Sequence, residues 1–330
     1  MASSAVEEEL PFRTAVLIAR RTDCPTENMP NRRPLRQRLQ SLRELRKSWD
    51  RIYSEHPDSP EVQHFALAAR HNLRHLSQAL SHGTFTFSAF RGRVLKQGKK
   101  RRGIMEPSVR DKIVQTTLLR LIYPCFRRAI MNPVSFGSVK SRKIEDAVLT
   151  IVEYHQQGFA WVFESDIRKF FDKVDRKILL ERVLTGLYDE TINDLITIAA
   201  NAELANKDIL IGNEDLFPGA GIGIPQGSVL SPVFANLYLA PFDAEMILMG
   251  FKMVRYVDDY VILCRSKEDA AAAHIASRDA LAKIGLEIHG LNEKNENGKI
   301  KTKITAYDDS FDFLGITFSA HRLQPARDKL

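Results

Sequence analysis

One short segment constrains the fold of this chain more than any other. Tyr256-Val257-Asp258-Asp259 lies between two apolar runs, with Met253 and Val254 before it and residues 261–263 after it. Consecutive residues of a strand point to opposite faces, so adjacent carboxylates between apolar runs indicate a β-hairpin whose turn carries the acids. A solvated Asp-Asp turn is the simplest alternative, because such turns are common.

A second acidic position favours a functional interpretation. Asp166 ends a strand-like run, residues 161–165, far upstream of the hairpin. Clustered carboxylate oxygens are ligands that Mg²⁺ prefers, and two such ions about 3.5–4 Å apart can activate a 3′-hydroxyl and stabilise leaving pyrophosphate. Asp166, Asp258 and Asp259 are therefore the candidate catalytic and metal-binding residues, with a chemistry typical of polymerases.

A third segment, residues 223–232, reads Gly-Ile-Pro-Gln-Gly-Ser-Val-Leu-Ser-Pro and precedes a predicted helix. Ser231 is expected as the N-cap and Pro232 in the first turn. The glycines beside Gln226 would let the backbone come close to a nucleotide or a template base. The apolar residues of the helix recur on one face: Val233, Phe234, Leu237 and Tyr238.

In this order, the segments resemble the palm of bacterial reverse transcriptases of the group II intron and retron type. They are Ser165-Asp166-Ile167-Arg168-Lys169-Phe170-Phe171-Asp172, residues 223–232, the Tyr-Val-Asp-Asp hairpin and Phe313-Leu314-Gly315. Upstream, the matching positions are Arg102, Pro107, Asp111 and Gln115, then Ser135-Phe136-Gly137 with Asp146-Ala147. The resemblance covers roughly residues 95–318, and its ordered motifs are highly specific.

Two departures from the family pattern affect details of the site. Val139-Lys140-Ser141 replaces the usual Arg-Pro-Gly, and an insertion separates Leu291-Asn292 from Lys301-Thr302. These changes leave the local template contacts open. They also leave open which lysine, Lys301 or Lys303, would protonate pyrophosphate.

The resemblance implies a set of metal ligands. Asp166 and Asp258 would be the principal ligands, Asp259 a weaker or outer one, and the backbone carbonyl of Ile167 would complete the coordination of the nucleotide metal. The implied cofactor is Mg²⁺, two ions per active site, with Mn²⁺ as a substitute. Asp172 and Asp175 are expected to be structural.

The resemblance also implies nucleotide contacts. Phe171 matches the position of the steric gate, where an aromatic ring excludes a 2′-hydroxyl; a core phenylalanine is the alternative, because Phe170 stands beside it. Arg102 would contact the incoming base or triphosphate, Gln226 the nucleotide or template, and Lys301 the pyrophosphate.

Positive charge gathers in two places in a chain whose formal net charge is +7. Residues 32–47 hold seven basic residues against one acid, Glu44, and a second cluster spans residues 91–102. Such clusters neutralise phosphates, although a solvated helix face is the alternative. The candidate RNA-binding residues are Arg36, Arg43, Lys99, Lys100 and Arg101.

The expected fold class is α+β, a right-hand polymerase with fingers, a palm built on an antiparallel sheet, and a helical N-terminal extension. Residues 1–82 would form a tail and that extension, with one basic amphipathic helix over residues 32–50 and a second beginning at Ser59-Pro60. Fingers would span 83–155, the palm 156–320 and a stub 321–330, with a helix over 267–284. A thumb is expected to be absent or truncated, its role taken by a second copy or an accessory protein.

The expected activity is RNA-directed DNA polymerisation from dNTPs on an RNA template, giving a DNA product. A stand-alone enzyme in phage defence with a structured non-coding RNA is favoured, with retron, diversity-generating and intron-derived enzymes as alternatives. An RNA-dependent RNA polymerase and a catalytically inactive RNA-binding palm are the other classes. Three cysteines without paired spacing and the lack of a membrane-span pattern predict a cytoplasmic protein without membrane contact.

Overall fold

The computed structural model describes residues 33–97, 100–201, 203–295, 298–320 and 322–326. Contacts along the chain divide it into two compact units, each built from segments distant in sequence. The described part of unit 1 comes from the ranges 128–173 and 235–326, and that of unit 2 from the ranges 33–127 and 174–234. The expected fingers and palm segments each contribute to both units, so their division along the chain stays a prediction.

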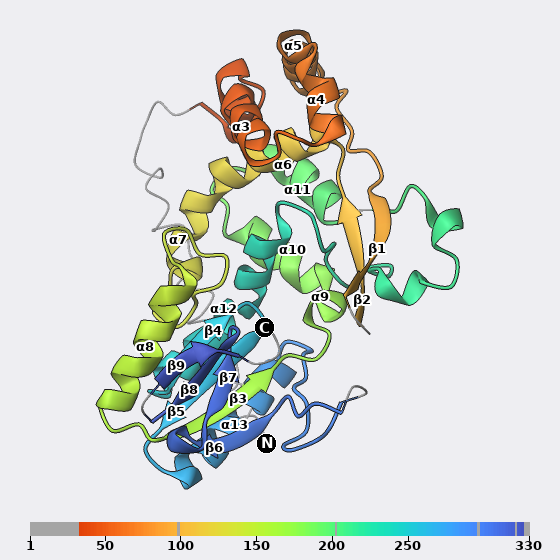
Figure 1. Ribbon diagram of the computed structural model, residues 1–330. Coiled ribbons are helices and arrows are strands. Elements are labelled where there is room, and N and C mark those ends of the chain that lie inside the picture. The colour runs from red at the N-terminus through yellow and green to blue at the C-terminus, as the bar shows by residue number, and fades with distance from the viewer. Residues whose placement is uncertain (1–32, 98–99, 202, 296–297, 321, 327–330) are drawn as a thin grey trace, which may run out of the picture. The chain divides into compact units, whose positions relative to one another are not determined.

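Unit 1 is built on a four-stranded antiparallel sheet with the order β4-β5-β3-β6 (Figure 1). β4 and β5 form the expected hairpin, joined by Val257 and Asp258 alone. The antiparallel sheet and the acid-bearing turn predicted from the sequence are therefore confirmed. The strands are β3 (Trp161–Asp166), β4 (Lys252–Tyr256), β5 (Asp259–Cys264) and β6 (Lys303–Ala306).

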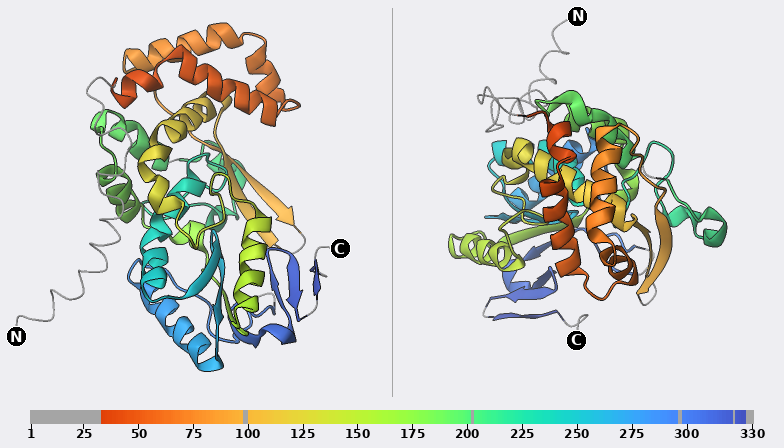
Figure 2. Two further views of the ribbon diagram at one scale, coloured as in Figure 1. Left: turned by 90° about the vertical axis from the view of Figure 1, so that its left-hand side faces the viewer. Right: turned by 90° about the horizontal axis from the view of Figure 1, so that it is seen from above.

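Helices cover both faces of this sheet, and strand alternation decides which residues each helix meets. α13 (Lys267–Ala282) lies against the face that carries Phe163, whose ring is 5.5 Å from that of His274. α8 (Ile144–Gln156) packs on the opposite face, where Ile151 shares an apolar cluster with Val162 and Val261. The left view of Figure 2 shows the sheet between these two helices.

A second, three-stranded sheet follows in unit 1. Its strands are β7 (Phe311–Phe313), β8 (Ile316–Ser319) and β9 (Arg322–Pro325), in that spatial order. Phe311, Phe313 and Phe318 enter the same apolar cluster as α8. The Phe-Leu-Gly motif therefore belongs to a hairpin that is fixed by core packing.

α12 (Ser231–Leu248) crosses the division between the units and begins one residue earlier than expected. Ser231 is its first residue and not its N-cap, because the carbonyl of Leu230 accepts the first helical bond, from the amide of Phe234 at 2.9 Å. The Ser231 hydroxyl donates to the carbonyl of Pro225 at 2.7 Å. Within unit 1, the Tyr238 hydroxyl donates to the Ile284 carbonyl at 2.6 Å. The expected apolar face is buried throughout.

The N-terminal helices of unit 2 differ from the sequence expectation. The basic helix is two helices, because the backbone of Ser41 is extended and interrupts the helical period. Leu42 is consequently 45% exposed, whereas Leu39 and Leu45 are buried. The second predicted helix begins at Pro60 as expected but is also divided. The four helices are α2 (Leu35–Leu39), α3 (Leu42–Glu55), α4 (Pro60–Ala66) and α5 (Ala69–Ser81).

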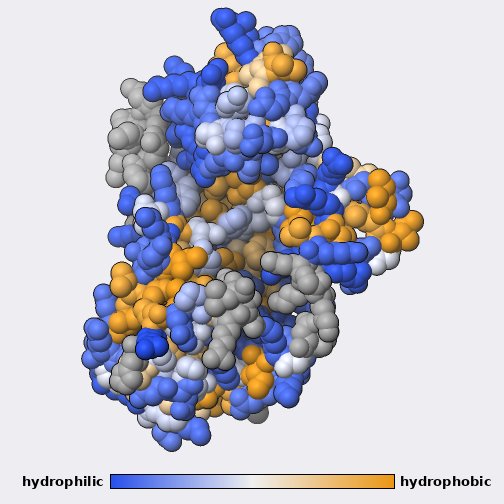
Figure 3. Space-filling model, viewed as in Figure 1, coloured by the Kyte–Doolittle hydropathy of each residue, from blue (hydrophilic) through white to orange (hydrophobic). Residues whose placement is uncertain are grey.

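The rest of unit 2 joins an antiparallel hairpin to helices. In the segment of residues 207–216, Leu210 packs with Phe90 and Met105, while Ile209 and Ile211 are 76% and 75% exposed. Figure 3 shows this apolar surface. The elements are β1 (Arg91–Gln97), β2 (Lys100–Glu106), α6 (Val109–Ile122), α10 (Arg176–Thr185), α11 (Asn193–Ala200), η4 (Lys207–Leu210) and η5 (Glu214–Leu216).

The remaining helices are short: η2 (Tyr123–Phe126), α7 (Arg127–Ile130), α9 (Phe170–Lys173), η3 (Glu190–Ile192) and η6 (Tyr307–Asp309). Across the described ranges, no helix combines the length and the apolar composition that crossing a membrane requires. Cys125 and Cys264 are buried, and neither forms a disulfide in the part of the chain that the structure describes. Cys24 lies outside the described residues.

Candidate active site

The three predicted carboxylates come together at one end of the unit 1 sheet. Asp166 is the last residue of β3 and Asp259 the first of β5, and the two are partners in the antiparallel register. Side chains of such partners lie on the same face with Cβ atoms about 4.5–5.5 Å apart. Asp258 precedes Asp259 in the turn, so acids distant in sequence become neighbours.

The backbone ties the end of β3 to the turn. The amide of Ile167, the residue after Asp166, donates to the carbonyl of Asp258 at 3.0 Å. This bond fixes the two acidic segments relative to each other. The side chain of Ile167 is buried, which holds the strand end against the core.

The structure distinguishes the two candidate lysines. Lys301 Nζ lies 2.5 Å from Asp166 Oδ2, whereas Lys303 Nζ lies 3.5 Å from Glu164 Oε2. The insertion before Lys301 does not displace it, because the amide of Asn292 donates to the Thr302 carbonyl at 2.8 Å and rejoins the interrupted motif. Lys301 is therefore the lysine that contacts a candidate metal ligand.

The pKa values of the site follow from burial and from the closeness of its acids and lysines. Burial raises the pKa of Asp259 to about 7, the charge of Asp166 adds to the rise, and Lys301 opposes it. Burial likewise raises the pKa of Glu164 to about 7, with Lys303 opposing. Burial lowers the pKa of Lys301, but its hydrogen bond to Asp166 and the surrounding acids more than offset this, so the net pKa is raised. Burial is thus the main cause of the raised pKa values of Asp259 and Glu164, and the lysines offset it only in part.

The donor chemistry fits a hard divalent cation. Among the described residues, no three His, Cys, Asp or Glu side chains form a ready-made metal site. Carboxylate oxygens are nevertheless the ligands that Mg²⁺ takes, and the pKa of Asp259 is raised first by burial and then by the charge of the neighbouring Asp166. We therefore expect Asp166, Asp258 and Asp259 to reorient when a cation binds.

The two adjacent phenylalanines have different environments. Phe170 is buried and packs against Tyr238, with ring centroids 6.5 Å apart. Phe171 is only partly buried and contacts Phe170 edge-on at 5.3 Å. Phe170 is thus the core residue, which leaves Phe171 available for the sugar contact that the sequence suggested.

Two predicted nucleotide contacts belong to unit 2. Arg102 is exposed on β2, and the amide of Met105 on the same strand donates to the carbonyl of Gln226 at 2.7 Å. A Cβ at Gly227 would lie 2.6 Å from the Met105 carbonyl oxygen. The glycine beside Gln226 therefore permits close approach to β2, the strand that carries Arg102.

The candidate RNA-binding residues differ in their exposure and in their contacts with the rest of the chain. Arg36 Nη1 lies 2.9 Å from Asp194 Oδ2 and is part of the fold of unit 2. Arg43 is exposed on α3. Arg101 is exposed and donates to Asn213 Oδ1 at 2.9 Å, and Lys100 begins β2. Lys99 falls outside the described residues.

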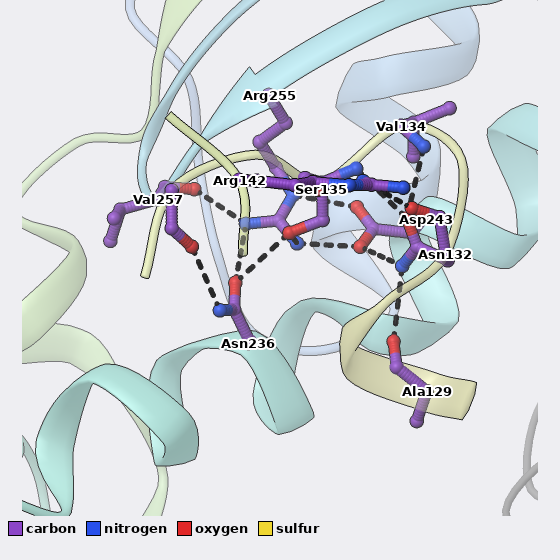
Figure 4. A network of polar contacts seen from close by, with 10 residues as sticks. Ala129, Asn132, Val134, Ser135, Arg142, Asn236, Asp243, Arg255 and Val257 are labelled. Atoms are coloured by element: carbon purple, nitrogen blue, oxygen red, sulfur yellow. Dashed lines mark hydrogen bonds and ion pairs between the residues drawn. The ribbon is translucent and has the colours of Figure 1, made fainter. Parts of the chain in front are cut away.

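Sequence reasoning missed a buried polar network beside the turn. Arg255 and Asp243 are both fully buried and form an ion pair with Nη2 and Oδ2 2.5 Å apart (Figure 4). Arg255 interrupts an otherwise apolar run in β4, and Asp243 interrupts one in α12. A charged residue within each apolar run was the sequence signal that could have indicated this network. Glu164 was missed as well, although it stands two residues before Asp166 and so shares its strand face.

Comparisons with known proteins agree with this arrangement. A family model described as "Reverse transcriptase (RNA-dependent DNA polymerase)" matches residues 94–318. Protein YkfC of Escherichia coli K12 is 26% identical over 276 residues, which are 71% of this chain and 66% of YkfC. The group II intron-encoded protein LtrA of Lactococcus lactis is 28% identical over 56% of this chain and 29% of LtrA.

A solved structure of telomerase from Candida albicans is similar in fold. It aligns with a TM-score of 0.50 and 12% identity, covering 73% of this chain and 46% of that one. The chain spans less than two thirds of the length of the two curated relatives. The comparisons thus agree on a polymerase fold across most of the described residues.

Proposed function

The chain belongs to the reverse transcriptase family, and from this premise we propose that it is an RNA-directed DNA polymerase. It would add deoxynucleotides to the 3′-hydroxyl of a primer paired with an RNA template. The observation that carries the proposal is the in-register pair of Asp166 and Asp259, with Asp258 in the adjoining turn and Lys301 bonded to Asp166.

Asp166, Asp258 and Asp259, with the carbonyl of Ile167, would hold two Mg²⁺ ions, or Mn²⁺ in their place. When bound, the ions would activate the attacking hydroxyl and neutralise the leaving pyrophosphate. Divalent metal use is general in this family, and its assignment to these atoms rests on the carboxylate cluster and on the raised pKa of Asp259.

Lys301 is proposed as the proton donor to the leaving pyrophosphate. Its pKa is raised by Asp166 and the neighbouring acids against the effect of burial, so the ammonium keeps its proton at neutral pH. A positioned general acid contributes about 10²–10⁴-fold to a rate. Lys303 forms an ion pair with Glu164 instead and is not assigned this role.

Nucleotide selection is proposed for three further residues. Phe171, partly exposed beside the buried Phe170, would lie under the sugar and exclude a 2′-hydroxyl. Arg102 would contact the base or triphosphate through its guanidinium, which both stacks and pairs with phosphate. Gln226 would contact the nucleotide or the template strand.

RNA is the proposed template, and a dedicated structured non-coding RNA stays a prediction. Exposed basic residues such as Arg43 and Arg101 would contact its phosphates. Phage defence, cytoplasmic location, and a second copy or accessory protein in the role of a thumb also stay predictions. Sequencing the nucleic acid that co-purifies with the protein would test the template assignment directly.

The test of the activity is incorporation of radiolabelled dNTPs on a primed RNA template with Mg²⁺. We expect extension that depends on the template and is abolished by a chelator. Preferential use of NTPs would identify an RNA-dependent RNA polymerase. Retained RNA binding without incorporation in Mg²⁺ or Mn²⁺ would identify a non-catalytic RNA-binding protein.

A further inference from the structure

The turn that carries Asp258 and Asp259 contains a strained residue. Val257 has a φ of +61°, in the left-handed region, although its side chain is β-branched. It is the first of the two residues that join β4 to β5, a position that hairpins with positive φ usually give to glycine. Such a conformation persists only where surrounding contacts hold it.

Arg255 supplies contacts of that kind. Its guanidinium is fully buried, and its Nη1 donates to the Val257 carbonyl at 2.8 Å. The other donations go to Asp243 Oδ1 at 2.6 Å and Oδ2 at 2.5 Å, to Asn236 Oδ1 at 3.2 Å and to Ser135 Oγ at 3.0 Å. An arginine side chain has five N–H donors, and these bonds engage all of them. Figure 4 shows Arg255 between the turn and Asp243.

The acceptors of Arg255 are themselves fixed. Asp243 Oδ2 also accepts from Asn132 Nδ2 at 2.7 Å. Asn236 Oδ1 accepts from Ser135 Oγ at 3.2 Å, and its Nδ2 donates to the Gly137 carbonyl at 3.0 Å. Every one of these groups is buried or partly buried, so the orientation of the guanidinium is determined from several sides.

The segment that contains Gly137 contacts the turn directly. The amide of Phe136 donates to the Arg255 carbonyl at 2.8 Å, so this segment runs beside β4. A Cβ at Gly137 would lie 2.6 Å from the Val257 amide nitrogen and 2.9 Å from the Tyr256 carbonyl carbon. The backbone of the segment that contains Gly137 therefore packs against the turn, in addition to the hydrogen bond from the Arg255 guanidinium.

Stability alone does not account for a buried ion pair here. Replacing such a pair with apolar residues of similar volume is often neutral or stabilising, because burying two charges is costly. Directed hydrogen bonds supply what apolar packing cannot, a fixed direction for the carbonyl of Val257. Groups that orient metal ligands in this way strongly affect metal affinity in other proteins.

We propose that Arg255, held by Asp243, Asn236 and Ser135, is a positioning residue that keeps Val257 left-handed and thereby sets where Asp258 and Asp259 point. We call these four residues and Gly137 the turn brace. The inference rests on the proposed function in that the acids it positions are the proposed metal ligands. The brace would act on metal affinity and not on substrate contact.

The test measures Mn²⁺ binding to the full-length, metal-free protein by electron paramagnetic resonance, together with hydrogen exchange of the Ile167 amide. Arg255→Lys keeps the charge but loses the fork of donors. We expect Mn²⁺ binding weakened about 10- to 100-fold, as for other residues that orient ligands. We also expect faster exchange at Ile167, whose amide bonds to the carbonyl of Asp258.

Matched variants separate positioning from general destabilisation. Ile151→Ala removes buried side chain from the α8 cluster of the same unit, and we expect it to lower stability while leaving Mn²⁺ affinity unchanged. Adding Val257→Gly to Arg255→Lys should restore part of the affinity, because glycine adopts positive φ without strain. Ser135→Ala, a smaller change, should weaken Mn²⁺ binding to a lesser degree and decides the question if Arg255→Lys does not fold.

Wild-type Mn²⁺ affinity in Arg255→Lys, or in Ser135→Ala when Arg255→Lys is unfolded, would overturn the proposal. An equal loss of affinity in Ile151→Ala would overturn it as well. A wild-type protein that binds Mn²⁺ but incorporates no dNTP would contradict the proposed function and leave this test valid. Without any Mn²⁺ binding, unchanged exchange at Ile167 in Arg255→Lys would still refute the brace.

Discussion

Asp166 and Asp259 are directly opposite each other in the β3–β5 register, so two carboxylates share one face at the end of a sheet. Like charges in such a pair destabilise the strands that carry them. Lys301 is bonded to Asp166, yet the pKa of Asp259 still rises to about 7, with burial as the largest cause. In the absence of a metal ion, the site therefore holds an electrostatic strain that can be measured.

The pH dependence of stability should reveal that strain. Because the pKa of Asp259 rises from 3.8 unfolded to about 7 folded, the folded protein binds more protons between these values. Stability of the metal-free protein should therefore fall as pH rises from about 4 to about 7. Asp259→Asn should reduce this fall and leave the part due to Glu164. Urea unfolding in the presence of a chelator at pH 5 and pH 8 measures this fall in both proteins. An unchanged pH dependence in Asp259→Asn would contradict the raised pKa of Asp259.

Removal of a metal ligand should abolish chemistry without unfolding the chain. Asp258→Asn is expected to slow dNTP incorporation at least about 100-fold, the scale of losing a key electrostatic group. Asp175→Asn is the matched control, because Asp175 caps α10 and asparagine caps equally well. Near-wild-type activity in a folded Asp258→Asn protein would rule out its role.

Sugar selection should depend on one of the two adjacent phenylalanines. Phe171→Ala is expected to raise NTP use relative to dNTP use, because it opens room for a 2′-hydroxyl. Phe170→Ala should lower stability by about 3–5 kcal/mol as a core truncation and leave the ratio unchanged. Single-nucleotide kinetics give the ratio for both variants, and equal ratios in both would remove Phe171 from the sugar site.

The two lysines provide another matched pair. Lys301→Met should reduce the rate of incorporation by about 10²-fold or more, since it removes the proposed general acid. Lys303→Met should have a much smaller effect, because Lys303 forms an ion pair with Glu164. The comparison is made by single-turnover kinetics over a range of pH. A similar loss in both variants would mean that the lysines act only by their charge.

Arg43 and Arg36 separate RNA contact from folding. Arg43→Gln should flatten the slope of log affinity against log salt by about one unit, since an exposed arginine on α3 can neutralise a phosphate. Arg36→Gln should lower stability and leave the slope unchanged, because Arg36 is bonded to Asp194. Filter binding over a range of salt tests both, and a wild-type slope for Arg43→Gln would favour a solvated helix face.

Local sequence patterns predicted several of the helices and strands of this protein. The acid-bearing hairpin, the strand that ends at Asp166 and the start of α13 at Lys267 follow from residues close to one another in the sequence. Strand alternation and turn chemistry act over that range, so the sequence displays them directly. The helix of residues 32–50 was wrong as a single helix, because the extended backbone of Ser41 interrupts a run whose apolar spacing continues across it.

Tertiary structure decided how these pieces meet. The register that pairs Asp166 with Asp259, the choice of Lys301 over Lys303, and the burial of Phe170 but not Phe171 each depend on residues remote in sequence. The ion pair of Arg255 and Asp243 also depends on residues remote in sequence, because β4 and α12 each look apolar apart from their charged residues. Register and burial are set by packing between distant segments, where many partners of similar chemistry compete, and only the folded chain selects among them.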